Sequence, residues 1–195
     1  MSRFIETILV KNGRVRNITY HQLRVERTLK HFFSTRPFNL ESVLLHAPKS
    51  GLFRCRLTYG KTVENIEYIP YEPVKKAKLL AIESDLNYNY KFKDRSSLDD
   101  LLKKAQHEGY DDALIVKDSL VTDTTIANIA FFNGRRWITP ARPLLRGTVR
   151  ARLLQSGIII PGNITIDNLG MFSHFALMNA LSGFYISGPT GNIKR

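Results

Sequence analysis

The sequence predicts an α+β fold made of two lobes. Its 195 residues are 43% hydrophobic and 24% charged, which suffices for one good core or two small cores and does not suggest disorder. Short strand-like segments fill the first part of the chain, and helical patterns alternate with strands in the rest. No linker rich in glycine and serine separates the two parts. We therefore expect closely packed lobes, with a small α+β domain over residues 1–75 and a larger α/β domain over residues 76–195.

The first domain is expected to open with a β-hairpin. The dipeptide Asn12-Gly13 lies between two segments rich in strand-forming residues, and this dipeptide favours a tight turn. A helix is expected over residues 21–34, where apolar side chains recur at helical spacing before Pro37. Three further strands are expected over residues 53–60, 62–71 and 76–84.

The second domain is expected to begin with a helix over residues 96–109. Ser96 or Ser97 can cap this helix, two aspartates lie in its first turn, and Gly109 can end it. The remaining expected elements are strands over residues 112–118, 120–134 and 135–140, a helix over 148–157, extended chain over 158–166, and a helix over 169–183 that runs into a final strand.

Charge and cysteine content limit the classes of function. The net charge of +12 is spread along the chain without an aromatic-interleaved platform, a helix-turn-helix or zinc-ligand spacing. This pattern does not favour direct binding of nucleic acid, and a small anionic substrate or cofactor explains some of the arginines equally well. The five histidines show no metal-ligand spacing, and we expect no metal site. The lone Cys55, the lack of a secretory signal and the lack of a long apolar run favour a cytoplasmic protein that does not enter a membrane.

Several short motifs occur in a specific order: FIET, HQLR, FRCRLTYG, YKFKDR, VTDTTIANIAFF, RGTVR and NALSG. Each motif is weak alone, but together they span about residues 4 to 184. In this order the sequence resembles the class IV aminotransferases, the fold-type IV enzymes that use pyridoxal 5'-phosphate. The resemblance implies the two-lobed fold of the D-amino-acid aminotransferase type, pyridoxal phosphate as cofactor, and a homodimer in which both chains contribute residues near the pocket.

Lys91 matches the lysine that binds the cofactor covalently in this family. In YKFKDR it lies four residues before the arginine that leads into the following helix. A lysine amine can condense with an aldehyde when a dry, cation-rich site lowers its pKa. Lys93 is the alternative if the register is shifted. Without the resemblance, either lysine would be assigned to the solvated surface.

Asp123 matches the glutamate that pairs with the pyridine nitrogen of the cofactor in the family. Aspartate has the required charge but is one methylene shorter, so either the ring sits closer or a water bridges the gap. The alternative role for Asp123 is a hydrogen bond to backbone in a turn, which is typical of aspartate. Asn128 matches an asparagine that positions the strand beneath the ring.

Two segments match the phosphate contacts of the family. Arg24 in HQLR corresponds to a helix arginine that binds the phosphate, and a planar guanidinium suits this anion. RGTVR corresponds to a turn at the start of a helix, where Gly147, Thr148 and Val149 would donate backbone N–H groups. The alternatives are a surface charge for Arg24 and a plain helix-entry turn for Gly147.

The resemblance also places a substrate contact and two departures. Arg54 matches a position that can bind a substrate carboxylate, and Arg56 is the alternative on the same face of the strand. Ala180 in NALSG replaces a threonine or serine that contacts the phosphate, and the chain has only three residues before Phe4 where the family has some two dozen before this position. Both departures suggest a trimmed site.

NALSG is more similar to the aminodeoxychorismate lyases of the family than to its branched-chain aminotransferases. The sequence therefore favours a lyase that releases pyruvate and forms 4-aminobenzoate for folate synthesis, acting on a small anionic amino substrate. A lyase needs no second substrate in the same pocket, whereas an aminotransferase must support two half-reactions. The alternatives are an aminotransferase for branched-chain or D-amino acids and a degenerate relative that binds without catalysis.

Overall fold

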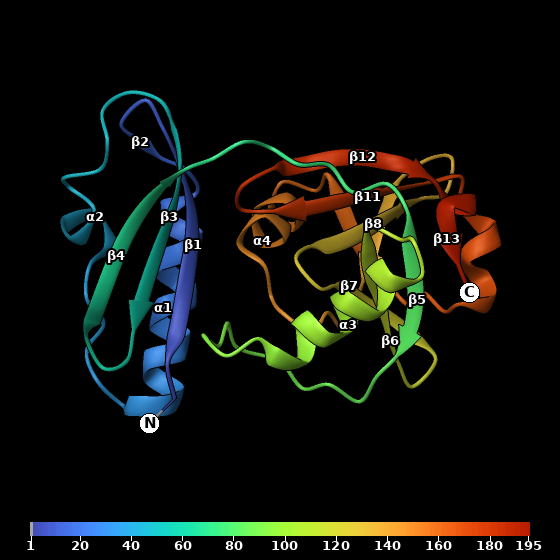
Figure 1. Ribbon diagram of the computed structural model, residues 1–195, viewed down its shortest axis with the longest axis horizontal. Coiled ribbons are helices and arrows are strands. Elements are labelled where there is room, and N and C mark those ends of the chain that lie inside the picture. The colour runs from blue at the N-terminus through green and yellow to red at the C-terminus, as the bar shows by residue number, and fades with distance from the viewer. Residues whose placement is uncertain (1) are drawn as a thin grey trace. The chain divides into compact units, whose positions relative to one another are not determined.

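The computed structural model describes residues 2–195, and these form two compact units (Figure 1). The first unit comprises the chain up to Pro73 together with Tyr90–Asp94, and the second comprises Val74–Asn89 and Arg95–Arg195. Among residues 2–195, no helix combines the length and the apolar character that crossing a membrane requires.

The first unit is an antiparallel sheet with a helix on one face, and its strands lie in the order β2-β1-β3-β4. Its elements are β1 (Phe4–Lys11), β2 (Arg14–Val15), α1 (Ile18–Phe33), α2 (Leu40–Val43), β3 (Leu52–Tyr59) and β4 (Val63–Pro70). The predicted Asn12-Gly13 hairpin is confirmed: both residues have positive φ, 49° and 75°, and Lys11 pairs with Arg14.

The alternation of side chains along β1 and β3 explains the core of this unit. Phe4, Ile8, Cys55 and Leu57 are completely buried and pack with Val25, Leu29 and other residues of the core that α1 covers. Successive side chains of a strand point to opposite faces, so Glu6 lies on the same face as Phe4 and Ile8. A carboxylate is thereby placed beneath α1, inside a mainly apolar core.

The second unit contains a mixed sheet of nine strands over the ranges 74–89 and 95–195. Its main path is β10-β9-β8-β7-β6-β5-β13, and β11 pairs with β8 and β12. Its elements are β5 (Leu79–Glu83), α3 (Ser96–His107), β6 (Asp112–Lys117), β7 (Leu120–Thr124), β8 (Asn128–Phe132), β9 (Trp137–Pro140), α4 (Thr148–Gln155), β10 (Ile159–Gly162), η1 (Asp167–Met171), β11 (His174–Asn179), β12 (Gly183–Pro189), η2 (Thr190–Asn192) and β13 (Ile193–Lys194).

The prediction of a helix over residues 169–183 is wrong. The structure has the short 3₁₀ segment η1 there, followed by β11, which pairs antiparallel with β8 and β12. Phe175, Ala176, Leu177 and Met178 are all at most 1% exposed because β11 is an inner strand that is covered on both faces. Such a strand is a continuous apolar run, and periodicity alone does not distinguish it from a buried helix.

Two smaller expectations are also corrected. The N-cap of α3 is Arg95, with no side-chain cap, rather than Ser96 or Ser97; the Arg95 carbonyl accepts the N–H of Asp99 at 2.8 Å, which starts the helix one residue early. The segment expected as one strand over residues 120–134 is instead the pair β7 and β8, joined by a tight turn in which the N–H of Thr124 donates to the carbonyl of Ala127 at 2.9 Å.

Candidate functional site

Lys91 lies in a short segment that pairs with the start of β1. The N–H of Ile5 donates to the carbonyl of Lys91 at 2.9 Å, and Phe92 forms an antiparallel bridge with Phe4, with their rings 5.1 Å apart. These contacts place Lys91 in the first unit, whereas we expected the larger domain to carry it. Lys91 is half-buried and Lys93 is exposed. The two candidate lysines, which flank the anchored Phe92, therefore have different surroundings.

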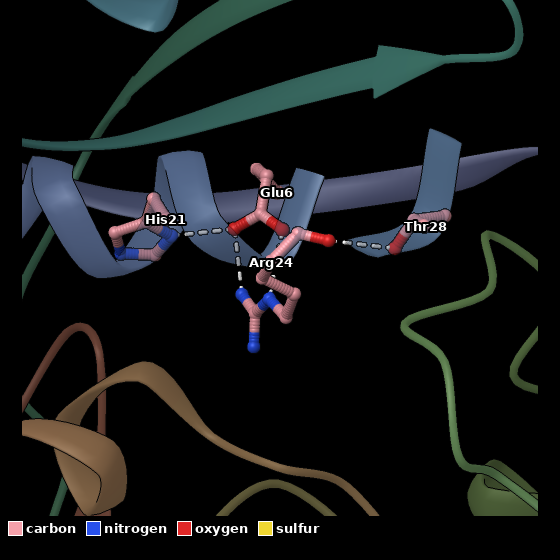
Figure 2. A network of polar contacts seen from close by, with 4 residues as sticks. All are labelled: Glu6, His21, Arg24 and Thr28. Atoms are coloured by element: carbon pink, nitrogen blue, oxygen red, sulfur yellow. Dashed lines mark hydrogen bonds and ion pairs between the residues drawn. The ribbon is translucent and has the colours of Figure 1, made fainter. Parts of the chain in front are cut away.

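Arg24 belongs to a buried network that the sequence reasoning did not anticipate (Figure 2). Its Nε and Nη2 donate to the two carboxylate oxygens of Glu6 at 2.8 Å and 2.6 Å, in a two-pronged pair. His21, three residues before Arg24 on the same face of α1, approaches Glu6 with its Nδ1 at 2.5 Å. Arg24 is therefore a buried, fixed guanidinium rather than a surface charge.

The charges of this network follow from its partners. Burial alone would raise the pKa of Glu6, but Arg24 and the hydrogen bond from His21 hold the pKa of this carboxyl at about 2. Burial lowers the pKa of His21, and the nearby charges of Arg24 and Lys91 lower it further, against the raising effect of Glu6. Glu6 is thus ionised at neutral pH, and the pairing with Arg24 neutralises its charge.

Arg54 and Arg56 lie on the other face of the same sheet. Cys55 and Leu57 are buried beneath α1, so the alternating arginines of β3 point away from that core, as the sequence predicted for the pair. Both arginines are half-buried. The Nε of Arg54 is buried and has no hydrogen-bond partner among the described residues, which leaves a buried donor for an anionic ligand.

In the second unit, Asp123 is a buried carboxylate held on both oxygens. Asn128 Nδ2 donates to its Oδ1 at 2.7 Å, and the N–H of Leu145 donates to its Oδ2 at 2.8 Å. Burial raises the pKa of Asp123 to about 6, although these hydrogen bonds and the charge of Arg150 oppose the rise. A carboxylate can accept about four hydrogen bonds, so it retains capacity for a protonated ring nitrogen.

Asn128 and Gly147 fit together closely. Asn128 Nδ2 also donates to the carbonyl of Leu145 at 2.8 Å, which ties β8 to the loop before α4. A Cβ placed on Gly147 would lie 1.9 Å from Asn128 Oδ1, closer than any pair of non-bonded atoms. Glycine is therefore required at position 147 if Asn128 is to hold both Asp123 and the loop.

The N-terminus of α4 provides donors for an anion. Gly147 is its extended N-cap, no side chain caps the helix, and its first turn contains no acidic residue. Thr148 and Val149 are buried there, and the helix dipole favours negative charge at this end. Arg150 is buried as well, and its Nη2 donates to the carbonyl of Pro140 at 2.8 Å. The burial of Arg150 is not evident from the motif RGTVR.

Ala180 lies in the turn between β11 and β12. The side-chain oxygen of Asn179 accepts the N–H groups of Leu181 and Ser182 and the hydroxyl of Ser182, each at 2.9 Å. The one nearby hydroxyl of the turn is thus engaged by Asn179, and position 180 contributes none. No cluster of three or more His, Cys, Asp and Glu side chains that could hold a metal occurs in the range 2–195.

The side chains described above in each of the two units are of the types that could bind pyridoxal phosphate. A half-buried lysine could bind its aldehyde, a buried and tethered carboxylate could accept from its ring nitrogen, and a fixed arginine and an uncapped helix N-terminus could bind its phosphate. The unpartnered Nε of Arg54 suits an additional carboxylate. The donor and acceptor groups of each unit therefore suit this cofactor, with the aspartate in place of glutamate as the main difference from the family, and the roles of the individual residues stay predictions.

Comparison with known proteins gives consistent results. Residues 3–186 match the family described as amino-transferase class IV. An uncharacterized protein of Haemophilus influenzae is 35% identical over 189 residues, covering 94% of this chain and all of that protein. A crystal structure named as a "putative 4-amino-4-deoxychorismate lyase" from Haemophilus somnus is 35% identical, covers 94% of this chain and 98% of that chain, and has a TM-score of 0.86.

Two more distant proteins also match, one by structure and one by sequence. A PLP-bound hypothetical aminotransferase from Mycobacterium tuberculosis has a TM-score of 0.79 at 16% identity, covering 95% of this chain and 80% of that chain. A "putative aminodeoxychorismate lyase" of Schizosaccharomyces pombe is 29% identical over 126 residues, which span 60% of this chain and 54% of that protein. The predicted fold class is confirmed by these structures.

Proposed function

Because the chain belongs to the class IV aminotransferase family, we propose that it is a pyridoxal-phosphate-dependent lyase that converts 4-amino-4-deoxychorismate into 4-aminobenzoate and pyruvate. The observation that carries the cofactor assignment is Asp123, a buried carboxylate tethered by Asn128 and Leu145. The choice of a lyase is supported by the 35% identical Haemophilus somnus protein, which is named for this activity and matched over nearly its whole length.

We assign the following roles to the residues of the chain. When bound, pyridoxal phosphate supplies an electron sink for the charge that develops at the amine-bearing carbon of the substrate. Lys91 would bind the cofactor aldehyde covalently, and its Nζ, when free, would remove the proton from that carbon. Asp123 keeps the ring nitrogen protonated. Arg24 and the backbone of Gly147, Thr148 and Val149 bind the phosphate, and Asn128 orients Asp123.

The elimination balances without a further reactant. Lys91 Nζ would accept the proton from the amine-bearing carbon, the bond between the ring and the enolpyruvyl oxygen would break with its electron pair going to oxygen, and the released enolate would take up that one proton at its methylene carbon to become pyruvate. The ring becomes aromatic in the same reaction, which makes the step favourable. Arg54 is proposed to bind a carboxylate of this small anionic amino substrate, because its buried Nε lacks a partner among the described side chains.

We further propose a homodimer that works in the cytoplasm, as the family resemblance and the single cysteine suggest. Nucleic acid is not among the proposed partners because the basic residues are scattered along the sequence. Sedimentation of the purified protein would test the dimer directly.

The second candidate function is aminotransfer between amino acids and keto acids. The match to the class IV aminotransferase family supports this function, because the family is described by aminotransfer and not by the lyase reaction. In this case Lys91 would have to return the proton to the cofactor rather than only remove it from the substrate.

The decisive assay incubates the purified, cofactor-loaded protein with 4-amino-4-deoxychorismate and follows pyruvate. We expect pyruvate and 4-aminobenzoate in equal amounts from the wild type and from Lys93→Ala, and none from Lys91→Ala. Conversion of amino acids to keto acids without any pyruvate release would instead identify an aminotransferase.

A further inference from the structure

Glu6 and His21 form a buried polar pair beneath α1 that the roles assigned above do not use. Both side chains have no exposed surface, and apart from the buried Arg24 and Thr28 the core beneath α1 is mainly apolar. Removing ionised groups from water is unfavourable, and a buried ion pair often adds no stability compared with well-packed apolar residues. A role in positioning therefore explains their presence better than stability does.

The contacts show what this pair positions. Glu6 accepts from Arg24 Nε at 2.8 Å and from Nη2 at 2.6 Å, so two bonds fix the plane of the guanidinium. The third nitrogen of Arg24 points away from Glu6 in Figure 2. His21 Nδ1 lies 2.5 Å from Glu6 Oε2, the same oxygen that accepts from Arg24 Nη2, and so also holds the carboxylate in place. Because His21 and Arg24 are three residues apart on α1, both approach from the same face of the helix.

The backbone of α1 is fixed at the same place. Thr28 Oγ1 donates to the carbonyl of Arg24 at 2.9 Å, within the helix that carries the arginine. The arginine is thus constrained at its backbone by the helix and at its head group by Glu6. A long side chain normally loses about 2 kcal/mol of rotamer freedom when it binds a ligand, and here this freedom is already lost before binding.

We propose that Glu6, held by His21, is a positioning residue that fixes the guanidinium of Arg24 for the phosphate of the cofactor. This inference rests on the proposed function, in which Arg24 binds that phosphate. Because the Glu6 side chain has no exposed surface, it would act through Arg24 rather than by touching the cofactor itself. Its loss should therefore weaken recognition of the phosphate and leave recognition of the pyridine ring and aldehyde unchanged.

The test compares pyridoxal phosphate with pyridoxal, which lacks the phosphate, by titrating the protein and following absorbance of the bound cofactor. Glu6→Gln keeps the size of the side chain but presents an N–H group to a donor of Arg24, so one of the two bonds is lost. We expect the Kd for pyridoxal phosphate to rise about 10- to 100-fold, with the Kd for pyridoxal within about twofold. Glu6→Asp, which keeps the charge, should give a smaller rise.

Two controls separate positioning from general damage. Glu64→Gln makes the same substitution in the exposed ion pair with Arg3 and should change neither Kd. In a protein that already carries Arg24→Lys, Glu6→Gln should add no further loss, because the two-pronged pair is already gone.

Each outcome decides the proposal. An equal rise in both Kd values would make Glu6 a general structural residue, and no rise in either would show that Arg24 needs no positioning; both results overturn the inference. If Glu6→Gln does not fold, the same comparison of the Kd for pyridoxal phosphate with the Kd for pyridoxal is made with Glu6→Asp. A wild type that binds pyridoxal as tightly as pyridoxal phosphate would instead refute the phosphate role of Arg24 in the proposed function.

Discussion

Gly147 is predicted to be indispensable only because Asn128 is present. Gly147→Ala would place a Cβ 1.9 Å from Asn128 Oδ1 and 3.1 Å from its Cγ, so the asparagine must move. It then loses its bonds to Asp123 Oδ1 and to the carbonyl of Leu145, at 2.7 Å and 2.8 Å. One of these bonds is to a charged group, and together their loss should destabilise the protein by about 3 kcal/mol.

The effect should vanish when Asn128 is removed. Gly147 has ordinary angles, φ −68° and ψ 149°, so alanine fits this backbone, and in an Asn128→Ala protein the second change should be neutral or stabilise by about 0.5 kcal/mol. Urea unfolding of the cofactor-free proteins, followed by the fluorescence of the single Trp137, measures the free energy of unfolding. The four proteins compared are the wild type, Gly147→Ala, Asn128→Ala and the double variant. Gly191→Ala, at a glycine with open space, is the matched control. An equal loss from Gly147→Ala in both backgrounds would refute the reasoning.

Three further predictions concern charged residues. The pKa of Glu6 is held at about 2, below its ordinary 4.5, so the folded state favours the ionised over the protonated carboxyl by about 3 kcal/mol. This contribution should be complete above about pH 5 and disappear as the pH falls to about 2; Glu6→Gln should flatten this part of the curve of unfolding free energy against pH. The pKa of Asp123 is raised by burial to about 6, so its ionisation should lower the stability of the cofactor-free protein as the pH rises from about 4 to about 6; an unchanged slope in Asp123→Asn would contradict this. Arg54→Lys should raise the KM for 4-amino-4-deoxychorismate about tenfold with kcat nearly unchanged, because uniform binding is lost; a fall in kcat at constant KM would argue against a binding role.

Local sequence signals predicted the first unit well. Asn12-Gly13 defines its hairpin because few other dipeptides adopt two positive φ angles easily. The alternation around Cys55 and Leu57 correctly indicated that Arg54 and Arg56 share a face. These features depend on neighbouring residues, and the sequence contains that information.

Features that depend on distant parts of the chain could not be predicted in the same way. The segment at Phe175 is a strand because β8 and β12 flank it, and the residues themselves would also suit a helix. The partner of Arg24 is Glu6, 18 residues earlier, and only the packing of α1 on β1 brings them together. HQLR suggested that His21 and Arg24 share a helix face, but nothing local indicated a carboxylate beneath it.

The most direct test of the account is the position at which the cofactor binds covalently. The protein is loaded with pyridoxal phosphate, reduced with borohydride, digested and analysed by mass spectrometry. We predict that the reduced cofactor is attached to Lys91, and that Lys91→Ala abolishes the modification while Lys93→Ala does not. Modification of Lys93 in the wild type, or no modification at saturating cofactor, would contradict it.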